Sequence, residues 1–206
     1  MNFLLFGCIA YILGSIPTAV WVGRAWYNLD VREHGSKNAG ATNTFRVLGK
    51  KPGIIVLSID VLKGFLAVFL PHLLLFNKIE NDVLIQIQIV SAIVVVLGHV
   101  FPVFANFKGG KGVATSLGVI FGIHPLAASI CLGLFLIVFI IGNYVSLGAI
   151  VASFSFPIII KFVFSETSLW LNTFSVILSF AVIIAHRKNM VRLVNGNESK
   201  MYLFKR

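Results

Sequence analysis

Hydroxyl, amide and cationic side chains gather without a single acidic residue in residues 35–46. Glycines allow backbone N–H groups to approach an oxyanion, and Ser, Thr, Lys and Arg side chains complete such a cradle. We therefore interpret this segment as a phosphate-binding loop, in which Asn38 and Thr42 can supply hydrogen bonds. The alternative is a flexible, solvated basic loop that is held by anionic lipid.

A second segment, residues 107–116, combines glycines with lysines directly before an apolar stretch. The N-terminus of a helix that starts there would present free N–H groups and the positive end of its dipole to an anion. Lys108, Gly109, Gly110 and Lys111 are therefore candidates for binding phosphate. The segment is not a Walker loop, because Gly112 stands where that motif needs Ser or Thr after the lysine. A tight glycine turn that only caps the helix is the alternative.

Polar residues also follow the last apolar run. His186 and Asn189 are three positions apart, so on a helix they share a face. Ser146, in a short turn before another apolar run, can add a hydroxyl. A basic tail that only anchors to anionic lipid is the simpler reading.

The chain lacks the residues that several common classes of enzyme require. The chain has no Gly-x-Ser-x-Gly elbow, and no Asp stands five positions after His34, His99 or His186, as the common acyltransferase motif requires. The acids beside the cationic segments are Asp30, Glu33 and Glu198, too few for a two-metal site. We expect no metal and no cofactor.

The composition indicates the class of protein that carries these polar segments. Of the 206 residues, 58% are hydrophobic and 12% are charged, about half the charged share of soluble proteins. We expect an all-α polytopic membrane protein with a single domain over residues 1–206. Runs long enough to cross a bilayer predict spans at residues 3–23, 54–76, 83–103, 145–160 and 169–185. Residues 113–141 form either one helix or two helices that break near Gly122 and Pro125.

Charge decides between these topologies. Lys and Arg number 17 against 7 Asp and Glu, for a formal net charge of +10. With two helices in residues 113–141, all of the 17 except Lys63, Lys78 and Lys161 lie in the cytoplasm, as the positive-inside rule asks. This predicts seven transmembrane helices, including a short half-span at residues 113–122, with the N-terminus outside and the C-terminus inside. Within the second span, Asp60 and Lys63 are expected to pair, because isolated charges in a membrane are costly.

At these residues the chain resembles the bacterial acylphosphate-dependent glycerol-3-phosphate acyltransferases, the PlsY family. The resemblance runs along essentially the whole chain and rests on residues 14–17, 35–46, 60–64, 98–115 and 186–200. It implies an enzyme of the bacterial inner membrane, with its active site on the cytoplasmic side. The implied reaction moves a fatty acyl group from acyl phosphate to the 1-hydroxyl of glycerol 3-phosphate, giving lysophosphatidate and inorganic phosphate for phospholipid synthesis.

Position by position, the resemblance also implies a set of phosphate-binding residues, namely Ser36, Arg46, Lys108, Lys111 and Ser146. It further implies that His186 and Asn189 complete the pocket, and together with Lys111, which we favour over Lys108, they are the catalytic candidates. The base is either His186 or a substrate phosphate with a pKa near 6. The expected partners are the two substrates and membrane lipid, with neither nucleic acid nor an obligatory protein. A transporter of an organic phosphate or anionic lipid is the alternative function, although its charges should lie nearer the midplane; a non-catalytic lipid-binding scaffold is a third.

Overall fold

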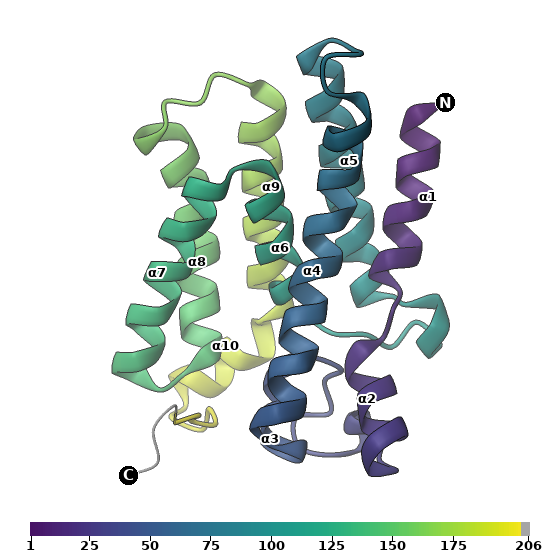
Figure 1. Cartoon of the computed structure of the whole chain (residues 1–206). Helices are drawn as coiled ribbons and strands as arrows, with labels where there is room; N and C mark the ends of the chain where they lie inside the picture. Colours follow the sequence, from purple (N-terminus) through teal and green to yellow (C-terminus); the bar gives the residue numbers. More distant parts are fainter. Residues whose placement is uncertain (203–206) are drawn as a thin grey trace. The chain divides into compact units, whose positions relative to one another are not determined.

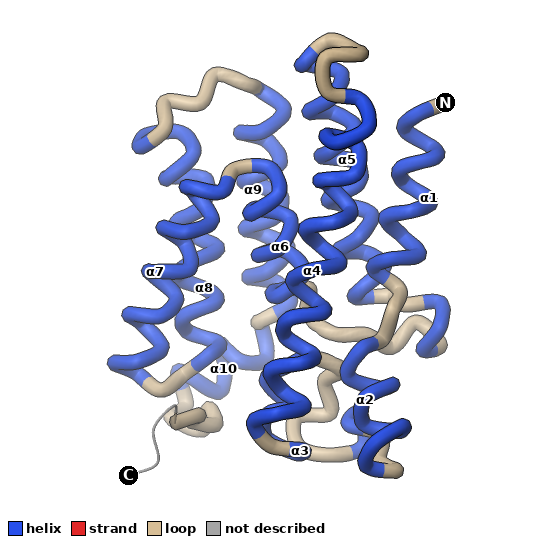
Figure 2. Tube along the Cα trace, viewed as in Figure 1, coloured by secondary structure: helices blue, strands red, loops and turns tan. Residues whose placement is uncertain are grey.

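The computed structural model describes residues 1–202, and over that range the chain consists of helices joined by loops, without a strand (Figures 1 and 2). In chain order the elements are α1 (Asn2–Gly14), α2 (Thr18–Tyr27), η1 (Val31–Glu33), α3 (Ala41–Leu48), α4 (Lys50–Leu75), α5 (Asn81–Val100), η2 (Val103–Ala105), α6 (Val113–Ile123), α7 (Pro125–Gly142), α8 (Val145–Ile158), η3 (Ile159–Val163), α9 (Leu169–Ala185) and α10 (Arg187–Val194).

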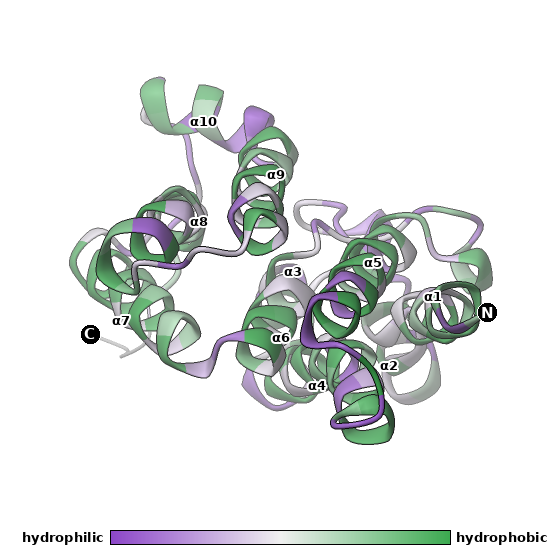
Figure 3. Ribbon diagram, turned by 90° about the horizontal axis from the view of Figure 1, so that it is seen from above, coloured by the Kyte–Doolittle hydropathy of each residue, from purple (hydrophilic) through white to green (hydrophobic). Residues whose placement is uncertain are grey.

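Most of these helices are predominantly apolar, as Figure 3 shows for α1 and α7, while hydrophilic residues lie mainly in the loops. By length and composition, 5 segments within residues 1–202 can cross a membrane, namely Asn2–Tyr27, Lys50–Leu75, Asn81–Ala105, Pro125–Gly142 and Val145–Val163. A sixth candidate joins α9 to α10 through a bend of 58°. The prediction of an all-α protein with several apolar spans is therefore confirmed.

The predicted break between the fourth and fifth apolar helices is also present. α6 ends at Ile123, and α7 begins at Pro125 with the ring of His124 accepting a hydrogen bond from the Ala127 N–H over 3.2 Å. Proline suits the first position of a helix because it has no N–H to leave unpaired. α6 has 11 residues and rises about 16 Å, roughly half of the hydrocarbon thickness. Counting it as the half-span of a seven-span topology, with the N-terminus outside, remains a prediction.

The chain divides into two compact units, Met1–Ile123 and His124–Arg206, the second of which is described up to residue 202. In the first unit, α4 packs against α6, α5, α3 and α1, and α1 also packs against α5. Small residues permit the closest approaches: a side chain at Gly14 would collide with the Val95 carbonyl, and one at Gly64 with the Thr115 carbonyl. Such contacts replace the hydrophobic effect as the cause of helix association in a membrane.

The second unit is a layer of α7, α8 and α9, in which α8 packs against both neighbours. α8 contains Pro157 and continues into η3, a π-helical turn. α10 packs against both α8 and α9. The α7–α8 turn and the C-terminal tail lie at the same end of this unit, since the Met201 N–H donates to the Asn143 carbonyl over 2.8 Å.

Candidate active site

The first polar loop is organised by a buried amide, Asn43, which is 1% exposed. Its Oδ1 accepts a hydrogen bond from the Ser36 N–H over 2.8 Å, and its Nδ2 donates to the carbonyls of Val31 at 2.7 Å and His34 at 3.1 Å. Asn43 thus holds the loop against η1. This role could not be predicted from the sequence, because composition does not separate an amide that shapes a loop from one that binds a ligand.

The predicted phosphate ligands of this loop lie close together along the chain and in space. Thr42 and Arg46 are on α3, four residues apart, and therefore share a face of that helix. Ser36 is exposed in the preceding loop, and Asn38 is half-buried there beside Gly40. The structure therefore brings these four candidates together in the segment of residues 36–46, whose shape the Asn43 side chain fixes.

An ion-pair cluster fixes the start of this loop. Asp30 pairs with Arg24 at 2.9 Å and with Arg32 at 2.7 Å, and Arg32 also donates to the Ala105 carbonyl over 2.9 Å. The Arg32 hydrogen bonds hold the pKa of Asp30 well below its usual range, although partial burial acts in the opposite direction. Because Ala105 ends η2, the cluster joins the first loop to the segment that leads into the glycine loop.

Lys108 lies at this cluster. A polar hollow of about 280 Å³ is lined by Arg24, Asp30, Arg32, Glu33, Asn106 and Lys108. Two carboxylates in the lining make this a poorer place for a phosphate than an acid-free loop. The preference for Lys111 over Lys108 as a phosphate ligand stays a prediction.

The glycine loop folds back onto the end of α5. The Gly109 N–H donates to the Val100 carbonyl over 3.1 Å, and the Gly110 N–H donates to the His99 carbonyl over 3.2 Å. A side chain at Gly110 would collide with the imidazole Nε2 of His99. Gly112 has φ +80°, a conformation that favours glycine. The N–H groups of Gly109 and Gly110 are engaged with the protein itself, so these glycines shape the loop.

The helix that follows the loop carries two buried hydroxyls. Thr115 and Ser116, in the first turns of α6, are both buried, and neither side-chain oxygen has a hydrogen-bond partner among the described residues. The first N–H groups of a helix also lack intrahelical partners. Donors therefore concentrate at the start of α6, directly after Lys111.

The expected pair inside the second span is present and belongs to a larger network. The Lys63 ammonium lies 2.8 Å from Asp60 and donates to the Ile16 carbonyl over 2.9 Å. Thr18 donates to Asp60 over 3.2 Å, and His99 Nδ1 lies 3.7 Å from the same carboxylate. Asp60 is 1% exposed and Lys63 is 3% exposed. The network joins the break between α1 and α2 to the end of α5, on which the glycine loop rests.

In the second unit, the carboxylate of Glu198 in the C-terminal tail is hydrogen-bonded to three polar side chains. Glu198 accepts hydrogen bonds from Ser146 at 2.8 Å, Asn189 at 2.6 Å and Arg192 at 2.7 Å. Burial raises the pKa of Glu198, but the hydrogen bonds from Arg192, Asn189 and Ser146 together outweigh it, so the pKa lies below its usual value. In the sequence, Glu198 is only one of the few acids beside the cationic segments. Its role as an organiser was missed because its partners lie up to 52 positions away.

His186 lies at the junction of α9 and α10 and is 4% exposed. Its Nδ1 is 2.8 Å from the Val182 carbonyl. A carbonyl only accepts, so Nδ1 carries the proton in this bond, and the basic lone pair of the neutral ring is on Nε2. The Asn189 N–H donates to the His186 carbonyl over 2.8 Å, which places both predicted residues on one turn.

The predicted site residues thus form two sets, each inside its own unit. The first unit holds Ser36, Asn38, Thr42, Arg46, Lys108, Gly109, Gly110 and Lys111, and the second holds Ser146, His186 and Asn189. Among residues 1–202, no group of three or more His, Cys, Asp or Glu side chains could hold a metal ion. Cations, hydroxyls and helix-start donors suit the binding of phosphate and the stabilisation of a phosphate leaving group.

Comparison with known proteins identifies the family. The family model described as glycerol-3-phosphate acyltransferase matches residues 4–196. A glycerol-3-phosphate acyltransferase of Fusobacterium nucleatum subsp. nucleatum is 43% identical over 200 residues, which cover 97% of this chain and 98% of that protein. One of Streptococcus pyogenes serotype M5 is 40% identical over 206 residues, which cover 97% of this chain and 93% of that protein.

Two crystal structures of PlsY, an integral membrane glycerol 3-phosphate acyltransferase, share the fold. The glycerol 3-phosphate form has a TM-score of 0.87 at 36% identity, covering 98% of this chain and 96% of that one. The lysophosphatidic acid form has a TM-score of 0.82 at 34% identity over the same shares. These matches in sequence and in fold, over nearly the whole length, show that the chain belongs to the glycerol-3-phosphate acyltransferase family and is an integral membrane acyltransferase.

Proposed function

We propose that this protein transfers a fatty acyl group from acyl phosphate to the 1-hydroxyl of glycerol 3-phosphate, giving lysophosphatidate and inorganic phosphate. The observation that carries the proposal is the solved relative in its glycerol 3-phosphate form, which is 36% identical over 98% of this chain. The acid-free segment of residues 35–46 and the lysine that precedes α6 supply the cations that two phosphorylated substrates need.

Acyl phosphate is a mixed anhydride, so the reaction needs neither another energy source nor a covalent enzyme intermediate. The substrate hydroxyl oxygen forms a bond to the acyl carbon, the bond from that carbon to the phosphate oxygen breaks, and inorganic phosphate leaves. The two substrates carry phosphates of about −1.5 to −2 charge each, which repel one another. Holding them together and offsetting the charge of the leaving phosphate is the main task of the protein.

We assign this task to the residues that the sequence singles out. Arg46 and Lys111 supply the principal charges. Hydroxyl, amide and further cationic contacts come from Ser36, Asn38, Thr42, Lys108 and Ser146, with Gly109 and Gly110 shaping the loop and Asn189 beside His186. We also propose that residues 1–206 act as one acyltransferase domain.

A substrate phosphate, with a pKa near 6, is the proposed base for the hydroxyl proton. His186 is the competing base, because its Nδ1 contact with Val182 leaves the basic lone pair on Nε2. His186→Gln distinguishes the two. Loss of a protein base lowers kcat by about 10²–10⁴ and removes its titration from the pH profile, whereas a substrate base leaves a titration near pH 6 in place.

We further propose seven crossings of the bacterial inner membrane, with the N-terminus outside and the cationic loops facing the cytoplasm. The excess of Lys and Arg in residues 24–51, 108–111 and 187–200 supports this orientation. Membrane lipid surrounds the protein, and no protein partner is required.

The direct test is to mix purified protein, acyl phosphate and glycerol 3-phosphate in detergent and to measure lysophosphatidate and phosphate. We expect the two products in equal amounts, little turnover with acyl-CoA and little effect of a chelator. Comparable turnover with acyl-CoA would overturn the donor assignment, and full inhibition by the chelator would overturn a metal-free mechanism. Absence of lysophosphatidate, together with movement of glycerol 3-phosphate into vesicles, would assign transport instead.

A further inference from the structure

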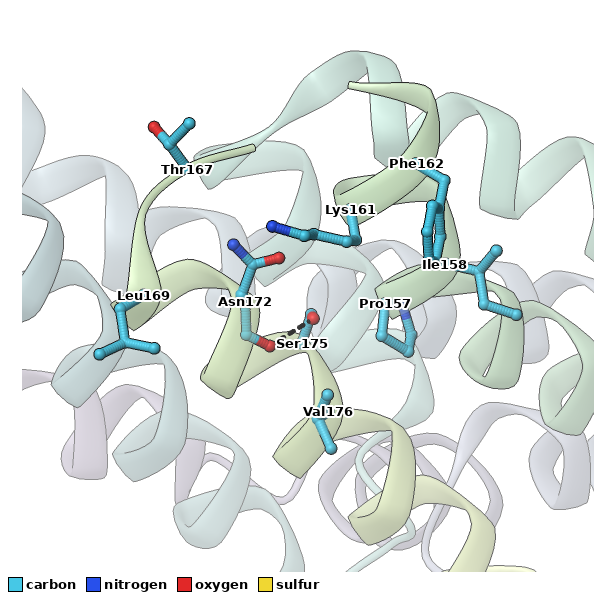
Figure 4. A pocket seen from close by; sticks show the side chains of 9 residues that line it. All are labelled: Pro157, Ile158, Lys161, Phe162, Thr167, Leu169, Asn172, Ser175 and Val176. Atoms are coloured by element: carbon cyan, nitrogen blue, oxygen red, sulfur yellow. Dashed lines mark hydrogen bonds between the residues drawn. The ribbon is translucent and has the colours of Figure 1, made fainter. Parts of the chain in front are cut away.

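The second unit contains a hollow of about 440 Å³ that belongs to none of the sites described above. It lies where α8 passes into η3 and α9 begins (Figure 4). Pro157, Phe162 and Val176 contribute apolar walls, and Lys161 and Asn172 contribute polar groups. Figure 4 shows the Lys161 side chain running across the hollow toward Asn172.

An irregular helix end creates this hollow. Pro157 lies inside α8 and has no N–H to donate. The chain then widens into the π-helical turn Ile159–Val163, and the Phe164 N–H donates to the Ile159 carbonyl over 3.1 Å. Single π-helical turns are frequently found at functional sites. Here the wide turn places Lys161 in the wall.

The two polar groups of the hollow can still form an ion pair and accept a hydrogen bond. Lys161 is exposed and forms no ion pair among residues 1–202, and the carboxylate of Glu166 accepts from the Ser168 N–H over 2.8 Å. Both amide hydrogens of Asn172 are used, toward the carbonyls of Glu166 at 3.0 Å and Ser168 at 2.8 Å. Its Oδ1 stays available as an acceptor. A fitting ligand therefore carries an anion for the lysine and a hydroxyl donor for the amide oxygen.

The position of the hollow at the end of a candidate membrane span indicates a ligand from the lipid bilayer. The candidate span Val145–Val163 ends here, and α9 starts at Leu169. Phe162 lines the hollow and is exposed, and Trp170, which follows the lining residue Leu169, is exposed as well, as aromatic residues are where a helix leaves the hydrocarbon and enters the headgroup layer. Ligands at this depth have a polar head and apolar chains.

We propose that this hollow binds an anionic glycerophospholipid of the phosphatidylglycerol type. Its phosphate pairs with the Lys161 ammonium, a headgroup hydroxyl donates to Asn172 Oδ1, and one acyl chain lies along Pro157, Phe162 and Val176. The site is separate from the proposed acyl transfer, since it uses none of the residues assigned to that reaction.

Native mass spectrometry of the full chain tests the proposal. The protein is purified in neutral detergent and titrated with phosphatidylglycerol and, separately, with phosphatidylcholine. We expect retained phosphatidylglycerol and a loss in Lys161→Ala on the order of fivefold, the factor typical of one lysine at an anionic membrane surface. Lys161→Arg should keep the lipid. Val176→Trp, which fills the apolar wall without changing charge, should lose it.

Lys78→Ala is the matched control, because Lys78 is an exposed cation between two other spans, in the first unit. It should retain phosphatidylglycerol as the unaltered protein does. Equal losses in Lys161→Ala and Lys78→Ala would overturn the site in favour of a general charge effect. Equal retention of phosphatidylcholine by the unaltered protein would overturn the headgroup assignment, and full displacement by soluble glycerophosphate would overturn the role of the apolar wall.

Discussion

Replacing Asp60 by asparagine should destabilise the protein far more than the loss of one charge on its surface. The change keeps the size of the side chain but leaves the buried Lys63 ammonium without its carboxylate, now 2.8 Å away. It also weakens the attachment of Thr18 and His99, which both lie against the same oxygen. Lys63 keeps only its bond to the Ile16 carbonyl as compensation.

The magnitude follows from the burial of both partners, at 1% and 3% exposure. Removing one member of a buried ion pair costs about 3–5 kcal/mol, because the other charge stays desolvated. For a chain of this size each kcal/mol corresponds to roughly 2–4 °C. Asp60→Asn should therefore lower the unfolding temperature by roughly 10 °C.

The assay is thermal unfolding in one detergent at constant salt, followed by tryptophan fluorescence and by loss of the monodisperse peak in size exclusion. The double variant Asp60→Asn with Lys63→Met removes both charges and should recover most of the loss, because no charge is then left desolvated. Asp82→Asn makes the same chemical change at an exposed position of α5 and should cost less than about 1 kcal/mol.

An Asp60→Asn variant as stable as the unaltered protein would contradict this prediction. So would a double variant less stable than Asp60→Asn, since an unpaired Lys63 would then not be the source of the cost.

Three further predictions concern the cationic loop, the tail and the topology. Arg46→Lys should raise KM for glycerol 3-phosphate on the order of tenfold or more, because lysine cannot bind two phosphate oxygens as a planar fork does, while Lys50→Ala should change it little; steady-state kinetics that give the reverse order would remove Arg46 from the site. The depressed pKa of Glu198 stabilises the fold above the unfolded pKa, and this contribution is lost as pH falls through the folded pKa, so Glu198→Gln should lower stability at pH 7 and flatten its acid dependence in thermal unfolding. A single cysteine placed at His124 should react with an impermeant thiol reagent from outside and one at Asn197 should not, so outside labelling of Asn197 contradicts seven crossings.

Features that depend on composition over a whole helix could be predicted from the sequence. The length of the apolar runs predicted helices that are long enough to cross a membrane. Gly122 and Pro125 predicted the break between α6 and α7. The Asp60–Lys63 pair was predictable because its members are three residues apart on one helix and a membrane leaves an isolated charge no other partner.

Features that depend on a single long-range hydrogen bond could not be predicted. Asn43 resembles any polar residue of its loop until its contacts with Val31 and His34 are seen. Glu198 meets Ser146 across 52 positions, and one sequence contains no period or motif that connects them. The expected phosphate ligands could be named because a ligand is recognised by its residue type. Asn43 and Glu198, which hold the loop and the tail in shape, were missed because their role depends on contacts that only the structure shows.

The position of Glu198 also has a consequence for biogenesis. A membrane protein is made from its N-terminus, so α8, which carries Ser146, is synthesised well before the carboxylate that ties the tail to it exists. Until then the polar end of this unit lacks the acceptor that Ser146, Asn189 and Arg192 share. Completion of synthesis therefore closes the cluster, and a chain interrupted before residue 198 keeps the helices but lacks the group that ties its tail to α8.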